Sequence, residues 1–179
     1  MTTYVAVLYS IILPAGKRLN MADLRQIAEG LGLDDPRTYG ASGNLIFEAR
    51  ATKVATLEKK LEDAYEARFG KRVDIMMRSA ADWKRMANGN PFPKESESEG
   101  SRVAVRIMRD RIPAGAEKKL RALCSGKEKV RIVDGDFWGY FDSGISNSKL
   151  IRATAREKQG IGTLRNANVV RAIAEMLAD

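Results

Sequence analysis

The chain has 179 residues, with 31 lysines and arginines against 23 aspartates and glutamates, one cysteine and no histidine. The lack of histidine excludes Ser-His-Asp and Cys-His catalytic machinery and histidine-ligated metal sites. A single cysteine excludes an internal disulfide and a cysteine-built zinc site. The hydrophobic fraction of 44% is sufficient for a folded core, so we expect one globular domain or two small ones.

The first half of the chain predicts the element order βαββαβ. The apolar, β-branched run at residues 4–13 favours a buried strand. Asn20 is a typical helix N-cap, and Ser42-Gly43 predicts a turn between two strands. The longest predicted helix of this half places Glu58 and Glu62 on its polar face. In chain order, the expected elements are a strand at 4–13, a helix at 21–31, strands at 36–40 and 44–49, a helix at 52–69, a strand at 73–77 and a short helix at 79–86.

The second half predicts a shorter version of the same order. Asp134-Gly135, between two strand-like runs, is a strong hairpin signal. Gly160-Ile161-Gly162 separates two predicted helices. In chain order, the expected elements are a strand at 102–108, a helix at 113–124, strands at 129–133 and 136–141, and helices at 149–158 and 166–178.

Together these elements predict an α+β fold of two successive αβ-plait (ferredoxin-like) subdomains. The first is expected at residues 1–93, where a short helix follows the βαββαβ elements. The polar run at 94–101 predicts an exposed linker. The second subdomain, at 102–179, is expected to be an incomplete βαββα unit that ends in a C-terminal helical segment.

Several short segments occur in a fixed order over nearly the whole chain. They are Met21-Ala22-Asp23-Leu24-Arg25, Arg37-Thr38-Tyr39, Ser42-Gly43-Asn44, Asn90-Pro91-Phe92, Ser148-Lys149-Leu150, and Thr163-Leu164-Arg165-Asn166 with Asn168. In this order they resemble the domain of unknown function 1697 (DUF1697) family, small bacterial proteins without an assigned activity. The resemblance implies two successive αβ-plait subdomains, in agreement with the predicted element order.

Two parts of the chain depart from the family pattern. The family usually follows its first strand with an Arg-Gly-Ile-Asn segment and a Gly-Gly pair, where this chain has Tyr9-Ser10-Ile11-Ile12 and Pro14-Ala15. Near the C-terminus, Ala167 replaces the usual aromatic residue and Val169 replaces a threonine. The resemblance therefore implies that any function of the family's first loop is altered or lost in the segment from Tyr9 to Ala15.

The net charge of +8 is concentrated near the C-terminus, where residues 143–171 contain six basic residues and only one acidic residue. Lys149 and Arg165 fall at predicted helix starts, and a cation at the positive end of a helix dipole is unfavourable unless both face a bound anion. Lys17 and Arg18 likewise precede a predicted helix. The candidate anion-binding residues are Lys149, Arg165, Asn166, Asn168, Ser148, Thr163, Lys17 and Arg18.

The same residues also fit a purely structural interpretation. Ser148 is an ordinary type of helix N-cap. Lys149 and Arg165 can point into water or pair with Asp142 and Glu157. A single cation at a helix start costs only about 0.3–1 kcal/mol, so its position does not require a ligand.

We predict that the protein binds a phosphate-bearing partner, either nucleic acid or a nucleotide, through these basic helix starts. One alternative is an enzyme that acts on a small phosphorylated or acidic metabolite with a carboxylate as general acid or base. Another is an interaction module that forms a homodimer through an exposed sheet. We expect no metal and no cofactor. No apolar run reaches the roughly 18 residues of a transmembrane helix and the start lacks a basic signal-peptide region, so we expect a basic cytoplasmic protein without a membrane partner.

Overall fold

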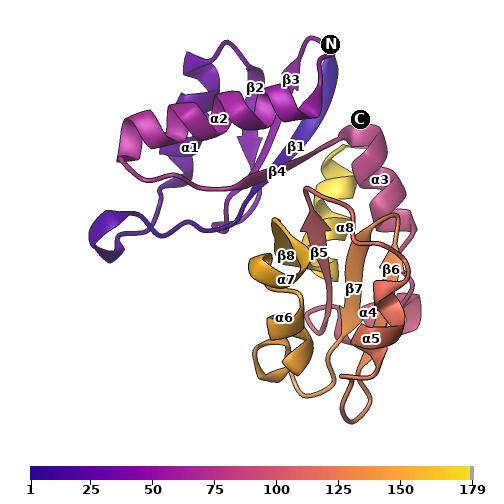
Figure 1. The fold of residues 1–179 in the computed structure, drawn as a ribbon. Coiled ribbons are helices and arrows are strands. Elements are labelled where there is room, and N and C mark those ends of the chain that lie inside the picture. Colours follow the sequence, from indigo (N-terminus) through magenta and orange to yellow (C-terminus); the bar gives the residue numbers. More distant parts are fainter. Residues whose placement is uncertain (178–179) are drawn as a thin grey trace. The chain divides into compact units, whose positions relative to one another are not determined.

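The computed structural model describes residues 1–177 apart from the side chain of Glu157, and the contacts within the chain divide it into two compact units. The N-unit comprises Met1–Trp83 and the C-unit comprises Lys84–Asp179, of which the structure describes all but the last two residues. Each unit is built on its own four-stranded antiparallel sheet with helices packed against it (Figure 1). The fold is therefore α+β, as predicted from the sequence.

The N-unit has the predicted order of strands and helices, and its strands lie in the order β2-β3-β1-β4. Asn20 is the N-cap of the first helix, where its Oδ1 accepts a hydrogen bond from the Ala22 N–H at 2.9 Å. Gly70 ends the second helix with a φ of +67°, a conformation that favours glycine. The elements are β1 (Thr2–Leu8), the 3₁₀ turn η1 (Pro14–Gly16), α1 (Met21–Gly30), β2 (Asp34–Thr38), β3 (Asn44–Ala49), α2 (Val54–Phe69) and β4 (Ile75–Ser79).

The first strand is shorter than the sequence predicts. β1 ends at Leu8 rather than at residue 13, because the chain then turns into a loop at residues 9–19. Ile11 and Leu19 of this loop are buried, and the Leu19 N–H donates to the Ile11 carbonyl at 2.7 Å. Part of the apolar run thus folds back onto the core, which explains why its composition resembled a continued strand.

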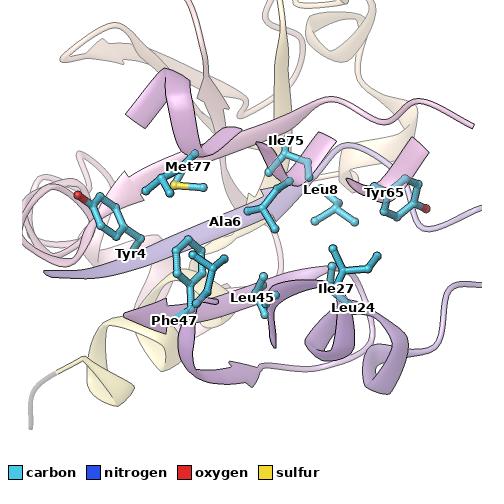
Figure 2. Close-up of a cluster of buried hydrophobic side chains, with 14 of the residues drawn as sticks. Tyr4, Ala6, Leu8, Leu24, Ile27, Leu45, Phe47, Tyr65, Ile75 and Met77 are labelled. Carbon is cyan, nitrogen blue, oxygen red and sulfur yellow. The ribbon is translucent and has the colours of Figure 1, made fainter. Parts of the chain in front are cut away.

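The core of the N-unit lies between one face of the sheet and the helices α1 and α2. Tyr4, Ala6 and Leu8 alternate along β1, so all three point to this face. Leu24 and Ile27 enter from α1 at helical spacing. Figure 2 shows these side chains together with those from β3, β4 and α2, which are Leu45, Phe47, Tyr65, Ile75 and Met77.

Two buried glutamates of α2 close one edge of this sheet, so the prediction that they lie on a polar face is wrong. The Glu62 carboxylate accepts the N–H of Ile75 and the Glu58 carboxylate accepts the N–H of Met77, each at 2.9 Å. The register with β1 directs both N–H groups away from that strand. The carboxylates therefore bind backbone groups that an edge strand otherwise leaves without a strand partner.

The C-unit has four strands in the order β6-β7-β5-β8. None of the helices within residues 1–177 combines the length and apolar character that crossing a membrane requires. The helix α3 (Ala80–Asn88) contains the boundary between the units. The remaining elements are α4 (Pro93–Glu99), β5 (Val103–Met108), α5 (Ala116–Arg121), β6 (Lys129–Val133), β7 (Asp136–Tyr140), the 3₁₀ turn η2 (Ile145–Asn147), α6 (Lys149–Ala153), α7 (Arg156–Gln159), β8 (Gly162–Asn166) and α8 (Ala167–Met176).

The strand β8 is missing from the sequence prediction, which expected an incomplete second half. Residues 162–166 pair with β5, so that Arg165 lies opposite Val105 and Thr163 lies opposite Ile107. The helix predicted at 149–158 is instead two short helices that lead into this strand. The unit therefore contains β5-α5-β6-β7-α6/α7-β8 followed by α8. Residue 178, the predicted end of the last helix, lies outside the described residues.

The run predicted as an exposed linker at 94–101 is also wrong, because α4 occupies most of it. Pro93 begins this helix, a position that tolerates its missing N–H. Ser96 is buried, and its Oγ accepts a hydrogen bond from the Asn90 side-chain amide at 2.7 Å. The segment therefore belongs to the C-unit, whose boundary lies near Trp83 rather than at residue 94.

Helices lie on both faces of the C-unit sheet. On one face, Leu120 of α5 and Leu150 of α6 pack with Phe137 and Phe141. Trp138 alternates with Phe137 along β7 and therefore points to the opposite face. The helix α8 belongs to that second face, where its buried residues include Val170 and Ile173.

Candidate functional site

Lys17 and Arg18 lie in the exposed loop of the N-unit that precedes α1. Neither has an ion-pair partner among residues 1–177. The helix start itself is capped by Asn20, which binds the Ala22 N–H. These two residues belong to the N-unit and the other six candidates belong to the C-unit. Their predicted role stays a prediction.

Ser148 and Lys149 begin α6. Ser148 is buried, and its Oγ accepts the Leu150 N–H at 3.1 Å, as expected of an N-cap. Lys149 is exposed. Leu150 packs on the α5 side of the sheet, opposite to the face of Trp138. These residues are therefore not neighbours of the candidates on α8.

Thr163 and Arg165 lie on β8, and Arg165 directly precedes Asn166, the N-cap of α8, in agreement with its predicted position just before a helix. Its guanidinium is buried and donates to the Thr163 hydroxyl at 3.2 Å and to the Leu164 carbonyl at 2.8 Å. Burial disfavours the charged form and lowers the pKa of Arg165 to about 10. Arg165 is thus a buried residue of the sheet, and the side chain of Glu157, a predicted ion-pair partner, lies outside the described part of the chain.

Asn166 and Asn168 stand at the start of α8. The Asn166 side chain is the N-cap and accepts the Val169 N–H at 3.0 Å. The Asn168 side chain accepts a hydrogen bond from the Arg171 guanidinium at 3.2 Å. Asn168 also fits closely against Gly100, because a Cβ built there would lie 2.1 Å from its Oδ1. Asn168 is therefore a hydrogen-bond partner of Arg171, a cation that was not among the candidates predicted from the sequence.

Arg171 lies at the rim of a cavity of about 520 Å³ in the C-unit. The cavity opens between α3 and α8, on the sheet face to which Trp138 points (Figure 1 shows these elements). Its lining residues are Lys84, Ala87, Asn88, Asn90, Ser96, Trp138, Ala167, Val170, Arg171, Ala174 and Glu175.

The lining combines an apolar wall with a polar rim. Trp138 and Val170 are almost fully buried, and the indole N–H of Trp138 has no hydrogen-bond partner in the described part of the chain. Lys84 and Arg171 bring two positive charges, and Glu175 brings one negative charge. Such a mixture of apolar contact area and a few polar groups is typical of small-molecule sites.

Two segments singled out in the sequence meet at this cavity. Asn90 of the Asn90-Pro91-Phe92 segment lines it, and its side chain orders the adjacent turn by accepting the Phe92 N–H at 2.9 Å. Ala167, between Asn166 and Asn168, lines it from the start of α8. The small side chain at this position leaves the space open. No pattern in the sequence pointed to Lys84 or Arg171, which come together only through the fold.

Comparison with known proteins places the chain in a family without assigning it an activity. The model of the family described as "Protein of unknown function (DUF1697)" matches residues 1–138. No curated protein matches the chain. A solved structure of a conserved bacterial protein from Streptococcus pneumoniae is 23% identical, with a TM-score of 0.75 over 98% of both chains. This likeness shows a shared fold across both units. The chain thus belongs to the DUF1697 family.

Proposed function

We propose that the protein binds a small phosphate-bearing ligand in the cavity between α3 and α8. The observation that carries this proposal is the convergence of Lys84 and Arg171 on a cavity with an apolar wall. Its volume of about 520 Å³ lies within the roughly 300–1,000 Å³ typical of ligand pockets. The proposal keeps the ligand class predicted from the sequence and moves the site away from the ends of α6 and β8.

The charges at the rim favour an anion. Among the described side chains, Lys84 has no ion-pair partner, and Arg171 has only the neutral Asn168 as a hydrogen-bond partner. The planar guanidinium retains N–H groups that can bind two oxygens of a phosphate at once. A phosphate between these two cations would satisfy both, and Glu175 would restrict the position that it can take.

The apolar wall favours a ligand with a flat organic body over a free phosphate ion. The half-buried Ala87 and Ala174 offer apolar contact area for such a body, in a lining that also contains the buried Trp138 and Val170. A ring system with a phosphate group, as in a mononucleotide, presents both required features in one small molecule. A volume of about 520 Å³ suits a single nucleotide better than a nucleic-acid strand. We therefore favour a nucleotide as the ligand of this cavity.

We also propose that each unit is an αβ-plait of the ferredoxin-like type. The element order βαββαβ supports this assignment for both units. The strand orders β2-β3-β1-β4 and β6-β7-β5-β8 support it as well, since they are the same when β5 to β8 are matched with β1 to β4.

A thermal-shift titration with AMP, GMP, UMP and ribose 5-phosphate tests the ligand proposal. A ligand present at 100 times its Kd stabilises the folded state by about 2.7 kcal/mol. We expect a shift with at least one nucleotide, and we expect Lys84→Ala combined with Arg171→Ala to remove it.

The matched control is Lys118→Ala combined with Lys119→Ala. These lysines form an exposed pair on α5 and lie outside the cavity, so the control removes the same charge. We expect it to leave the shift unchanged. If none of the four compounds stabilises the unmutated protein, or if both double variants lose the shift equally, the proposal fails.

A further inference from the structure

The loop at residues 9–19 of the N-unit exposes large apolar side chains. Tyr9 is 55% exposed and Ile12 is 43% exposed. Only Met1 and Leu123 are other large hydrophobic residues with comparable exposure within residues 1–177. The loop extends to the side of the N-unit sheet, at the left of Figure 1. The exposed ring of Tyr9 is therefore accessible to a binding partner.

The backbone of this loop is fixed by its own hydrogen bonds. The Leu13 N–H donates to the Lys17 carbonyl, and the Leu19 N–H donates to the Ile11 carbonyl, each at 2.7 Å. Ile12 and Arg18 pair as an isolated antiparallel bridge. The loop is thus a short antiparallel ribbon in which residues 11–13 form one arm and residues 17–19 form the other. Its exposed side chains are carried by a hydrogen-bonded backbone.

The positive charges of the ribbon have no acidic neighbours in the sequence. No aspartate or glutamate occurs from residue 9 to residue 22. Lys17 and Arg18 are exposed and have no ion-pair partner within the described residues. Lys71 adds a third cation, because its Nζ donates to the Ile12 carbonyl at 2.7 Å. Lys71 and Arg18 therefore lie beside Ile12, while Asp74, whose carbonyl accepts the Tyr9 N–H at 2.9 Å, is an acidic residue next to Tyr9.

We propose that this ribbon is a docking surface for single-stranded nucleic acid. Lys17, Arg18 and Lys71 would contact successive phosphates, and the Tyr9 ring would stack on a base. The combination of cations with an exposed aromatic ring favours this partner, because an acidic polypeptide offers charge but no base to stack. The surface lies in the N-unit and is separate from the proposed nucleotide cavity of the C-unit.

Fluorescence anisotropy with a labelled 20-mer of deoxythymidine tests this proposal. For the unmutated protein we expect binding that weakens steeply as salt rises. Lys17→Ala combined with Arg18→Ala should reduce the slope of log K against log salt by about 1.4, since each contact to a single strand contributes about 0.7. Tyr9→Ala should weaken binding roughly 5- to 100-fold, whereas Tyr9→Phe should keep most of the affinity.

Two controls separate this surface from general charge effects. Lys118→Ala with Lys119→Ala removes the same charge from an exposed pair on α5, and Lys84→Ala with Arg171→Ala removes it from the cavity rim. Both should bind the oligonucleotide as the unmutated protein does. Failure of the cavity proposal therefore leaves this test intact.

Three results would overturn the proposal. The first is an absence of salt-sensitive binding by the unmutated protein, whose folding is checked by circular dichroism. The second is an equal loss in the Lys118 and Lys119 double variant. The third is an unchanged affinity of Tyr9→Ala together with full competition by poly-glutamate, which would assign the surface to acidic polypeptides instead.

Discussion

The two units share one strand order but differ in the helices that cover their sheets. In the N-unit, α1 and α2 pack on one face and fill the space beneath them with large apolar side chains. In the C-unit, α5 and α6 occupy the corresponding face, and α8 follows the last strand onto the other face. The cavity lies between α8 and α3. The comparison indicates that an added helix can form a cavity beside a sheet whose strand order is unchanged.

The units also protect their edges by the same chemistry on different strands. In the N-unit, Glu58 and Glu62 of α2 bind the outward N–H groups of β4. In the C-unit, Glu117 of α5 binds the N–H of Ile132 on β6 at 2.9 Å. The first unit uses two buried carboxylates, whereas the second uses one that is partly exposed. Edge closure should therefore contribute more to the stability of the N-unit.

The largest effect is expected from Glu58→Ala combined with Glu62→Ala. This change leaves two buried N–H groups without an acceptor, at roughly 1–3 kcal/mol each, so we expect the free energy of unfolding to fall by about 2–6 kcal/mol. Glu117→Ala should cost less. Urea unfolding measures both, with Glu29→Ala on the exposed face of α1 as the control. Equal losses in all three variants would contradict this account of the edges.

The next effect concerns Gly100, which lies beneath the start of α8. A Cβ at this position would lie 2.1 Å from Asn168 Oδ1 and 2.9 Å from the Ser96 carbonyl. Gly100→Ala should therefore cost about 1–3 kcal/mol and displace the partner of Arg171, which would weaken nucleotide binding. Gly115→Ala is the control, because its added Cβ would meet nothing within 4 Å. Unchanged nucleotide affinity in Gly100→Ala would show that Asn168 does not position Arg171.

The two asparagine caps offer a matched pair across the units. Asn20 caps α1 and Asn166 caps α8, each through one side-chain hydrogen bond. Replacing either by alanine should lower the free energy of unfolding by about 1 kcal/mol. Only Asn166→Ala should also weaken nucleotide binding, because α8 carries Arg171. If both variants bind a nucleotide equally well, the start of α8 has no role at the site.

The smallest effect is a pH dependence in the C-unit. The Tyr140 hydroxyl donates to the Glu99 carboxylate at 2.7 Å, and this bond raises the pKa of Tyr140 above its usual value of 10.0. Because the folded-state pKa is raised, the resulting stability is present below pH 10 and is lost as the pH rises through the raised pKa. Unfolding in urea between pH 8 and 11 should show a steeper decline for the unmutated protein than for Tyr140→Phe. Parallel curves would argue against this contribution.

The elements with strong local signals could be predicted from the sequence. The cap at Asn20, the stop at Gly70 and the hairpin at Asp134-Gly135 each depend on residues close in sequence. These features need no knowledge of distant contacts.

The features that depend on distant contacts escaped prediction. The strand β8 contains glycine, threonine and asparagine and becomes a strand only by pairing with β5. The polar sequence of α4 is typical of an exposed linker. In the fold, however, Ser96 is buried and accepts a hydrogen bond from Asn90. The helical periodicity of α2 predicts that Glu58 and Glu62 are exposed to solvent. Their carboxylates instead accept backbone N–H groups of β4, which is distant in the sequence.

None of the residues that line the cavity was among the predicted site residues. Lys84 and Arg171 are separated by almost half of the chain and carry no motif, so their convergence needs the tertiary fold. Arg165 lies just before the N-cap of α8, as predicted, but the strand that the prediction missed buries its side chain in the sheet.

Isothermal titration of the protein with AMP tests the central claim most directly. We predict one site per chain in the unmutated protein. We also predict a loss of affinity of at least about tenfold in Lys84→Ala with Arg171→Ala, since hydrogen bonds to charged groups contribute roughly 1.5–3 kcal/mol each. The control with Lys118→Ala and Lys119→Ala should titrate like the unmutated protein. Binding that persists undiminished without Lys84 and Arg171, or no binding by the unmutated protein, would contradict the account.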